Sequence, residues 1–357
     1  MGMILANRYY GCLGLCSGLL LLMSTEPQPA AQDQPSRFRV NVDLVQLNVA
    51  VTDRKGNYIA GLRPEDFTIT EDKLPEKIAT FEEGTESARK HALQNAGKTP
   101  DPDQQVPSLA PADAKTSLVA GANVFILFDT SDYMYRGFVF AQDAVANFIR
   151  SMDDANKIAF YSYSRDLSRA TALTTDRFRV VNGVRNTVAG DEAALYNCML
   201  LTVEDAAPLK GRKAIVVFSN GPDNASSVPP EDVAELAQST GTIIYIISTR
   251  EAQTEPVSAA AFERVSRATG GKAYFAKDWR QERQAFNAVR EDLDHLYTVS
   301  YYPQANTNRG WRKIKVNLVG KDLQKYHIRT RDGYRVMQQA APSGESDSAR
   351  TSEPDPQ

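Results

Sequence analysis

Residues 123–129 read Asn-Val-Phe-Ile-Leu-Phe-Asp, and the chain continues through Thr-Ser-Asp-Tyr to Met134. The apolar run is typical of a strand that is buried on both faces of a parallel sheet. It ends at a carboxylate, which two hydroxyl-bearing residues follow. Ligands of open α/β sheets bind in the crevice beyond the carboxyl ends of the strands. Asp129 and Ser131 are therefore the first candidates for a binding site.

Similar apolar runs recur downstream and alternate with helical patterns. The further runs lie at 158–161, 214–218 and 243–247. Helical periodicity or helix-start residues mark 139–152, 176–188, 193–206, 230–239, 258–269 and 279–297. This alternation predicts an α/β fold over residues 118–296, with a doubly wound, mostly parallel, Rossmann-like sheet.

The segments on either side of this domain are rich in β patterns. Residues 37–84 alternate apolar and polar side chains between turn signals, which predicts a small immunoglobulin-like β-sandwich of about five strands. Residues 297–336 form a short β-rich segment, which either extends the edge of the α/β sheet or joins the sandwich. The polar stretches 85–117 and 337–357 are expected to be a linker and a disordered tail.

The N-terminus carries a candidate export signal. Arg8 precedes an apolar run from Cys12 to Met23, which is short for a membrane span and suits a Sec-type signal peptide over residues 1–31. The protein is therefore expected to be periplasmic, envelope-associated or secreted, with an uncleaved membrane anchor as the alternative. Cleavage would leave Cys198 as the only cysteine, and its apolar helical surroundings predict a core residue.

Composition and motifs argue against several classes of protein. The formal net charge is −3, and no basic run with interleaved aromatic residues suggests nucleic-acid binding. No Gly-x-Gly-x-x-Gly opens a helix, so no nucleotide cofactor is expected. No Gly-x-Ser-x-Gly elbow is present, and none of the histidines at 91, 295 and 327 pairs with a nucleophile. Ser131 stands where a haloacid dehalogenase-type phosphatase needs a second Asp. A non-enzymatic protein is the expectation.

Three polar loops follow predicted strands or precede predicted helices, at 129–134, 190–196 and 219–224. Carboxylates and hydroxyls that converge at one sheet edge suit a hard divalent cation such as Mg²⁺ or Mn²⁺. Asp132, Asp191 and Asp223 lie in these loops and are either ordinary solvated carboxylates or additional ligands of a rearranged site.

On these residues the chain resembles a von Willebrand factor type A (vWA) domain protein, in the bacterial form labelled vWFA-related and best known from Acidobacteria. The resemblance includes the lead-in segments 49–56 and 61–67, and it ends near residue 334. It implies a metal ion-dependent adhesion site (MIDAS), built from Asp-x-Ser-x-Ser, a Thr of a second loop and an Asp of a third. Asp129 and Ser131 match, but Tyr133, Ala193 and Asn220 stand at the other three positions.

The altered positions predict a degenerate site. Tyr133 is bulky, Ala193 has no side-chain oxygen and Asn220 lacks charge, whereas Mg²⁺ prefers near-octahedral oxygen coordination. No bound metal is therefore the favoured expectation, with Mg²⁺ or Mn²⁺ as the ion if one binds.

The resemblance implies binding to a protein or a cell-envelope component through the carboxyl edge of the sheet. The expected contact face includes Tyr133, Tyr135, Ala193 and Asn224, while Phe138 and Phe140 are expected to anchor the first helix in the core. Two alternatives stay open. One is a metal-dependent hydrolase that uses Asp129, Asp132 and Asp223, and the other is a structural envelope component assembled through the sandwich.

Overall fold

The structure is a computed structural model that describes residues 44–84, 121–152, 156–219, 221–248 and 256–336, all within one compact unit, Val42–Gln357. The expected signal peptide, linker and tail, and the candidate ligand Asn220, lie outside the described residues. So do the side chains of Tyr135 and Arg136.

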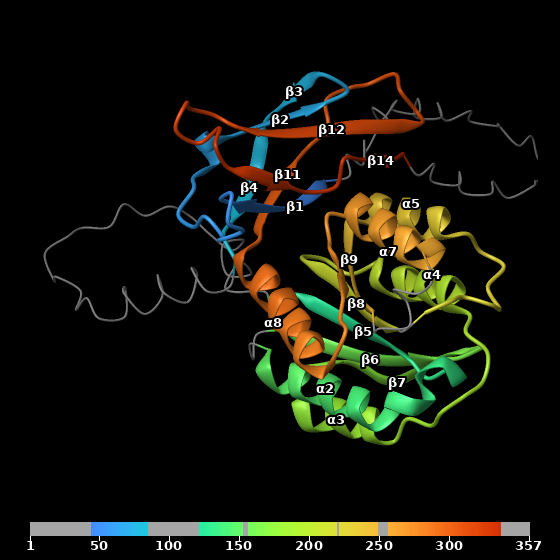
Figure 1. Ribbon diagram of the computed structural model, residues 1–357. Helices are drawn as coiled ribbons and strands as arrows, with labels where there is room; N and C mark the ends of the chain where they lie inside the picture. The colour runs from blue at the N-terminus through green and yellow to red at the C-terminus, as the bar shows by residue number, and fades with distance from the viewer. Residues whose placement is uncertain (1–43, 85–120, 153–155, 220, 249–255, 337–357) are drawn as a thin grey trace, which may run out of the picture. The chain divides into compact units, whose positions relative to one another are not determined.

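A six-stranded sheet forms the centre of the α/β domain, in the order β10-β9-β8-β5-β6-β7 (Figure 1). Its strands are β5 (Asn123–Asp129), β6 (Lys157–Tyr163), β7 (Leu167–Thr174), β8 (Lys213–Ser219), β9 (Thr242–Ser248) and β10 (Ala273–Phe275). All neighbours are parallel except β7, which runs antiparallel to β6 at the edge. The doubly wound, mostly parallel sheet is confirmed.

Two strands of this sheet were missed because they lie at its edges. In β7 only Thr171 is buried, and β10 has just three residues, all half-buried. Neither forms the apolar run that identifies a strand buried on both faces.

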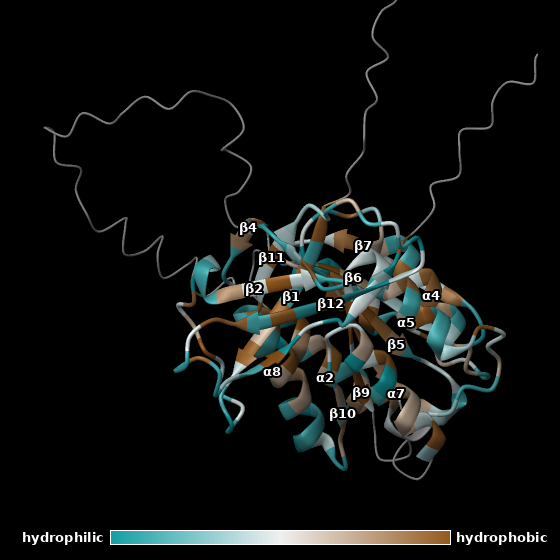
Figure 2. Ribbon diagram, turned by 90° about the horizontal axis from the view of Figure 1, so that it is seen from above, coloured by the Kyte–Doolittle hydropathy of each residue, from teal (hydrophilic) through white to brown (hydrophobic). Residues whose placement is uncertain are grey.

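Helices cover both faces of the sheet. One face holds α2 (Phe138–Ser151), α3 (Arg177–Arg185) and α8 (Trp279–His295), and the other holds α4 (Leu195–Ala206), α5 (Pro230–Thr240) and α7 (Pro256–Ala268). Successive residues of β5 face alternate cores, with Val124, Ile126 and Phe128 in the first and Phe125 and Leu127 in the second. Figure 2 shows brown central strands beside helices of mixed colour, as helices with one buried face should appear. Cys198 is buried on α4, as expected.

The remaining strands form a sandwich of two four-stranded sheets. Their orders are β13-β1-β11-β4 and β14-β12-β2-β3. The first half of the chain supplies β1 (Val45–Thr52), β2 (Phe67–Glu71), β3 (Leu74–Glu76) and β4 (Ile78–Glu82), with a short 3-10 turn, η1 (Pro64–Asp66), before β2. The C-terminal segment supplies β11 (Tyr297–Tyr301), β12 (Trp311–Leu318), β13 (His327–Arg329) and β14 (Gly333–Arg335). The described part of the predicted sandwich, residues 44–84, therefore does not form a sandwich by itself, and the C-terminal strands join it instead of extending the α/β sheet.

The two parts of the chain are held together around a buried carboxylate, Asp292 of α8. Its oxygens accept hydrogen bonds from the hydroxyls of Tyr58 at 2.6 Å and Tyr245 at 2.5 Å, and it pairs with Arg329 of β13. Burial alone would lower the pKa of Arg329, but the Asp292 carboxylate outweighs it and raises that pKa. Since α8 runs directly into β11, this cluster fixes the sandwich strands against the α/β domain.

Within the described ranges, none of the helices is both long and apolar enough to span a membrane.

Lys213, at the start of β8, predicts a dependence of stability on pH. Burial, together with the charge of Arg331, lowers its pKa to about 8. The unfolded chain then holds the proton more tightly, so stability should rise with pH between about 8 and the ordinary value of 10.5. We expect the free energy of unfolding, measured with urea, to increase by about 2 kcal/mol from pH 7 to 9.5. This increase should be absent in Lys213→Met.

The matched control is Lys157→Met, because Lys157 starts the neighbouring strand β6 but is exposed. It should keep the gain of the unaltered protein. An equal gain in Lys213→Met would contradict the prediction.

Candidate functional site

Four parallel strands end in polar residues at one edge of the α/β sheet, which we call the carboxyl edge. Asp129 ends β5, Tyr163 ends β6, Ser219 ends β8 and Ser248 ends β9. Asp129 is in register with Tyr163, and Ser219 with Ser248. The pairing of the strands therefore brings side chains from distant parts of the sequence into one buried row.

Asp129 is the centre of this row. Its side chain is 1% exposed, with Oδ1 accepting from the Ser131 backbone N–H at 2.9 Å and Oδ2 from the Ser219 hydroxyl at 2.6 Å. Burial raises the pKa of Asp129, and these hydrogen bonds offset the effect only in part. Each carboxylate oxygen thus accepts a hydrogen bond from a neighbour in the same chain.

Backbone hydrogen bonds join the loops around Asp129. Thr130 N–H donates to the Tyr163 carbonyl at 2.8 Å, and Gly190 N–H donates to the Thr130 carbonyl at 2.7 Å. Asp132 N–H donates to the Asp191 carbonyl, also at 2.8 Å. A Cβ at Gly190 would lie 2.4 Å from the Ser164 hydroxyl, so only glycine permits this approach. The loops form one connected layer above the sheet.

Asp223 and Asn224 close the layer on its other side. The Asp223 carboxylate accepts from the Tyr196 N–H at 2.9 Å and from the Ser226 hydroxyl at 2.6 Å, so it caps the first turn of α4. The Asn224 side chain accepts from the Ala193 N–H at 2.8 Å and donates to the Tyr133 hydroxyl at 3.3 Å. Asp223 therefore holds this loop against the start of α4.

The described residues do not fit the octahedral ion that the MIDAS resemblance implies. Ser131 Oγ is buried without a hydrogen-bond partner in the described part of the chain, as a ligand atom could be. However, Asp129 is already bonded, Ala193 supplies no oxygen from its side chain, and Tyr133 is bonded to Asn224. Across the described ranges, no group of three or more His, Cys, Asp or Glu side chains could hold a metal ion. Of the MIDAS positions in the described residues, only Asp129 and Ser131 therefore carry the oxygen ligands that the resemblance implies.

The other candidate residues fall into an exposed group and a buried one. Asp132 and Asp191 are exposed and meet through the backbone, and Tyr133 and Asn224 are exposed at the same edge. Ala193, in contrast, is 1% exposed, so its side chain cannot belong to a contact face. The Ala193 backbone instead forms hydrogen bonds with Asn224.

An apolar ridge stands beside these loops. Val139 and Phe140 in the first turn of α2 are 63% and 72% exposed, and Val188, just after α3, is 79% exposed. One helical turn below them, Gln142 donates to the Val184 carbonyl at 2.9 Å and Asp143 pairs with Arg185 at 2.5 Å. Residues three and four apart share a helix face, so Val139 and Phe140 lie over the junction with the end of α3. We call Val139, Phe140 and Val188 the α2–α3 ridge.

The prediction that Phe140 anchors α2 in the core is wrong, because its side chain is 72% exposed. Phe138 is half-buried and packs on Phe128 with ring centroids 5.6 Å apart. Sequence reasoning also missed Ser219 and Tyr163 as partners of Asp129. Their position at strand ends was visible, but which neighbours they meet depends on strand order. The Asp-x-x-Ser spacing at 223–226 is a recognisable turn signal that could have marked Asp223 as a cap.

Comparison with known proteins identifies the α/β domain. Residues 123–288 match the family model of the von Willebrand factor type A domain. Domains of this family support protein–protein or adhesion-type interaction in general. No curated protein matches the chain.

Solved structures with a similar fold include three that differ widely in source. An aerotolerance-related membrane protein from Bacteroides fragilis is 14% identical, covers 48% of this chain and 98% of its own, and has a TM-score of 0.41. A von Willebrand factor type A protein from Catenulispora acidiphila is 13% identical, covers 59% of this chain and 66% of its own, and has a TM-score of 0.42. Proximal thread matrix protein 1 from the mussel byssus, described with a zinc-occupied MIDAS motif, is 14% identical over 48% of each chain, with a TM-score of 0.42. Likenesses of this size carry no information on function.

Proposed function

Because residues 123–288 are a von Willebrand factor type A domain, we propose that this protein is an exported, non-enzymatic binding protein. Its partner is a protein or a protein component of the cell envelope, bound at the carboxyl edge of the sheet. The observation that carries the proposal is the α2–α3 ridge, an exposed apolar surface beside the layer of loops. Large apolar side chains exposed together are typical of contact sites.

The proposed contact face combines apolar and polar groups. The ridge supplies Val139, Phe140 and Val188, and the loops supply Tyr133 and Asn224, which are joined by a hydrogen bond. Asp132, Asp191 and Glu192 add exposed carboxylates at its margin. A partner with an apolar centre and basic margin would complement this face, because affinity concentrates in buried apolar and aromatic anchors while charged margins steer association.

The proposed interaction does not need a metal. In a metal-dependent site, a partner carboxylate would complete the coordination of the ion. Here the Ser219 hydroxyl and the Ser131 N–H already hold Asp129, and Asp223 is used as a cap. Affinity must then come from direct contacts of the ridge and the polar rim.

The absence of metal dependence can be measured directly. Calorimetric titration with Mg²⁺ and with Mn²⁺ is expected to give no saturable heat, because Tyr133 and Ala193 replace two of the oxygen ligands of a MIDAS and the Asp129 carboxylate is bonded within the chain. Asp129→Ala serves as the matched control and should give the same trace. Saturable heat that Asp129→Ala abolishes would contradict the metal-free proposal and direct the search to carboxylate-bearing partners.

The ridge itself is tested by a double substitution, Phe140→Asp with Val188→Asp. Protein captured from envelope extract by the unaltered chain should bind the variant at least tenfold more weakly, which corresponds to about 1.4 kcal/mol. The measurement is quantitative mass spectrometry of cross-linked partners, with binding of the identified partner then titrated.

Phe178→Asp is the matched control, because Phe178 is 76% exposed but lies in the first turn of α3, at the opposite end of that helix from the ridge. It should leave capture unchanged. The proposal fails if the ridge variant and the Phe178 variant capture the same partners to the same extent.

A further inference from the structure

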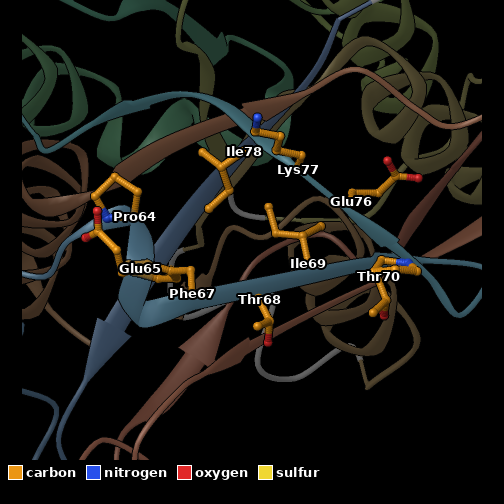
Figure 3. A pocket seen from close by; sticks show the side chains of 10 residues that line it. Pro64, Glu65, Phe67, Thr68, Ile69, Thr70, Glu76, Lys77 and Ile78 are labelled. Carbon is orange, nitrogen blue, oxygen red and sulfur yellow. The ribbon is translucent and has the colours of Figure 1, made fainter.

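A groove opens the sandwich between β2 and β4. It has a volume of about 440 Å³ and is lined by η1, β2, β3 and the start of β4. Figure 3 shows Ile69 and Ile78 on opposite sides of the groove, with the Lys77 ammonium turned away from both. Phe67 and Ile69 are buried, whereas Ile78 is half-buried. The apolar interior of the sandwich therefore reaches the surface at this groove.

The outer edge of β4 runs along the groove. β4 is the last strand of its sheet, and in the described part of the chain it pairs only with β11. The chain arrives from the other sheet, because β3 pairs with β2 up to Glu76 and β4 begins at Ile78. A strand edge with unpaired N–H and C=O groups readily accepts a further strand. The groove and this edge together form a surface that a second strand would cover.

Residues 77–82 read Lys-Ile-Ala-Thr-Phe-Glu and have the same pattern in both directions. Ile78 and Phe81 are half-buried and pack on the sandwich core, while the other four residues are exposed. Residues three apart in a regular strand would face opposite sides of the sheet. Ala79, however, has no partner residue in β11, and this bulge brings Ile78 and Phe81 to the same face. The segment is therefore charged at its ends, with opposite signs, and apolar at two matching positions between them.

We infer that two copies of this protein pair through β4, antiparallel about a two-fold axis at the centre of residues 77–82. In this register Lys77 lies opposite Glu82 of the second copy. Ile78 likewise lies opposite Phe81 of the second copy. A two-fold interface repeats each contact, and the two four-stranded sheets that contain β4 become one continuous sheet. This inference does not depend on the proposed function.

Charge and apolar surface both favour a second copy as the occupant. Phe81 of the second copy would lie beside Ile78 at the groove, and apolar surface that each copy exposes alone would be buried. Among the described residues, neither Lys77 nor Glu82 forms an ion pair within its own chain. Opposite charges directly across an antiparallel pair stabilise it, whereas like charges destabilise it. The antiparallel register brings both charges of each copy to an opposite charge.

Sedimentation of the full chain over a dilution series tests the inference, and the unaltered protein should show a monomer–dimer equilibrium. Lys77→Glu places like charges opposite each other at two symmetric positions, so the dimer should dissociate about tenfold more readily. Glu82→Lys should weaken the dimer to a similar extent. An equimolar mixture of these two variants should dimerise like the unaltered protein, because each altered position then meets an opposite charge on the other copy.

Lys315→Glu is the matched control, because Lys315 is exposed on β12, which lies between β14 and β2 in the other sheet. It makes the same charge change in the sandwich and should leave the dimer unchanged. Glu82 also lies within electrostatic reach of the buried Arg212 of its own chain. Circular dichroism during heating therefore checks the fold of every variant, and Lys77→Glu tests the inference alone if Glu82→Lys does not fold.

The outcomes are distinct. A weaker dimer in each single variant, with recovery in their mixture, supports the inference. A protein that stays monomeric throughout, with β4 amides that exchange rapidly with deuterium, overturns it and leaves the edge to a strand of a different protein. Slow exchange of the β4 amides in a monomeric protein also overturns it, because the chain then covers its own edge. A dimer that Lys77→Glu leaves unchanged overturns the placement at β4.

Discussion

Replacing Asp292 with alanine is expected to lower the free energy of unfolding by about 3–5 kcal/mol, as for other buried ion pairs that lose one partner. Asp292 is fully buried and binds Tyr58, Tyr245 and Arg329. The substitution leaves the Arg329 guanidinium, the half-buried Tyr58 hydroxyl and the buried Tyr245 hydroxyl without this acceptor. Urea unfolding at pH 7 measures the change.

The control for this prediction is Glu235→Ala, which removes an ion pair of the same kind from the surface. Glu235 pairs with Arg335, and both side chains are about half exposed. Exposed pairs contribute only about 0–1 kcal/mol, so this variant should unfold almost like the unaltered protein. Equal losses in the two variants would mean that Asp292 is not the anchor between the sandwich and α8.

A fragment of residues 37–84 alone is expected not to fold. Of its four strands, only β2 and β3 pair with each other, while β1 pairs with β11 and β13, and β4 pairs with β11. The fragment also lacks Tyr297, Val299 and Tyr301, which are fully buried in the sandwich core. A lone two-stranded hairpin is at best marginally stable. Circular dichroism and amide dispersion in NMR spectra should show an unfolded chain with no cooperative transition.

Adding a peptide of residues 297–336 provides the complementary measurement. It carries β11 to β14, so mixing the two fragments should restore β-sheet signal and a cooperative transition. Cooperative unfolding of residues 37–84 by themselves would contradict the prediction.

The sequence predicted the α/β part well because its signals are local. Continuous apolar runs identified β5, β6, β8 and β9, and helical periodicity identified α2, α3, α4, α5, α7 and α8 within a few residues at their ends. Asp176, the first residue of the predicted helical stretch 176–188, caps α3 by accepting from the Arg179 N–H. The edge strands β7 and β10 gave no such signal because most of their residues are only partly buried.

The candidate site was predicted only in part. The position of Asp129 at a strand end follows from the sequence, but its bond to Ser219 joins residues 90 apart. Burial of Ala193 and exposure of Phe140 likewise depend on which loops and helices meet. A small apolar residue and a large one cannot be assigned to core or surface without their neighbours.

By itself, the sequence determined most helices and strands of the α/β domain, its parallel sheet and the loops at the carboxyl edge. Hydrophobic periodicity and turn-forming residues specify these features over a few residues. Only the tertiary structure decided that the first and last strands share two sheets, since pairing between residues some 250 positions apart depends on how the α/β domain brings them together. It also decided that the polar groups around Asp129 bond to one another. A buried carboxylate needs partners, and here the strand order supplies them from the chain itself.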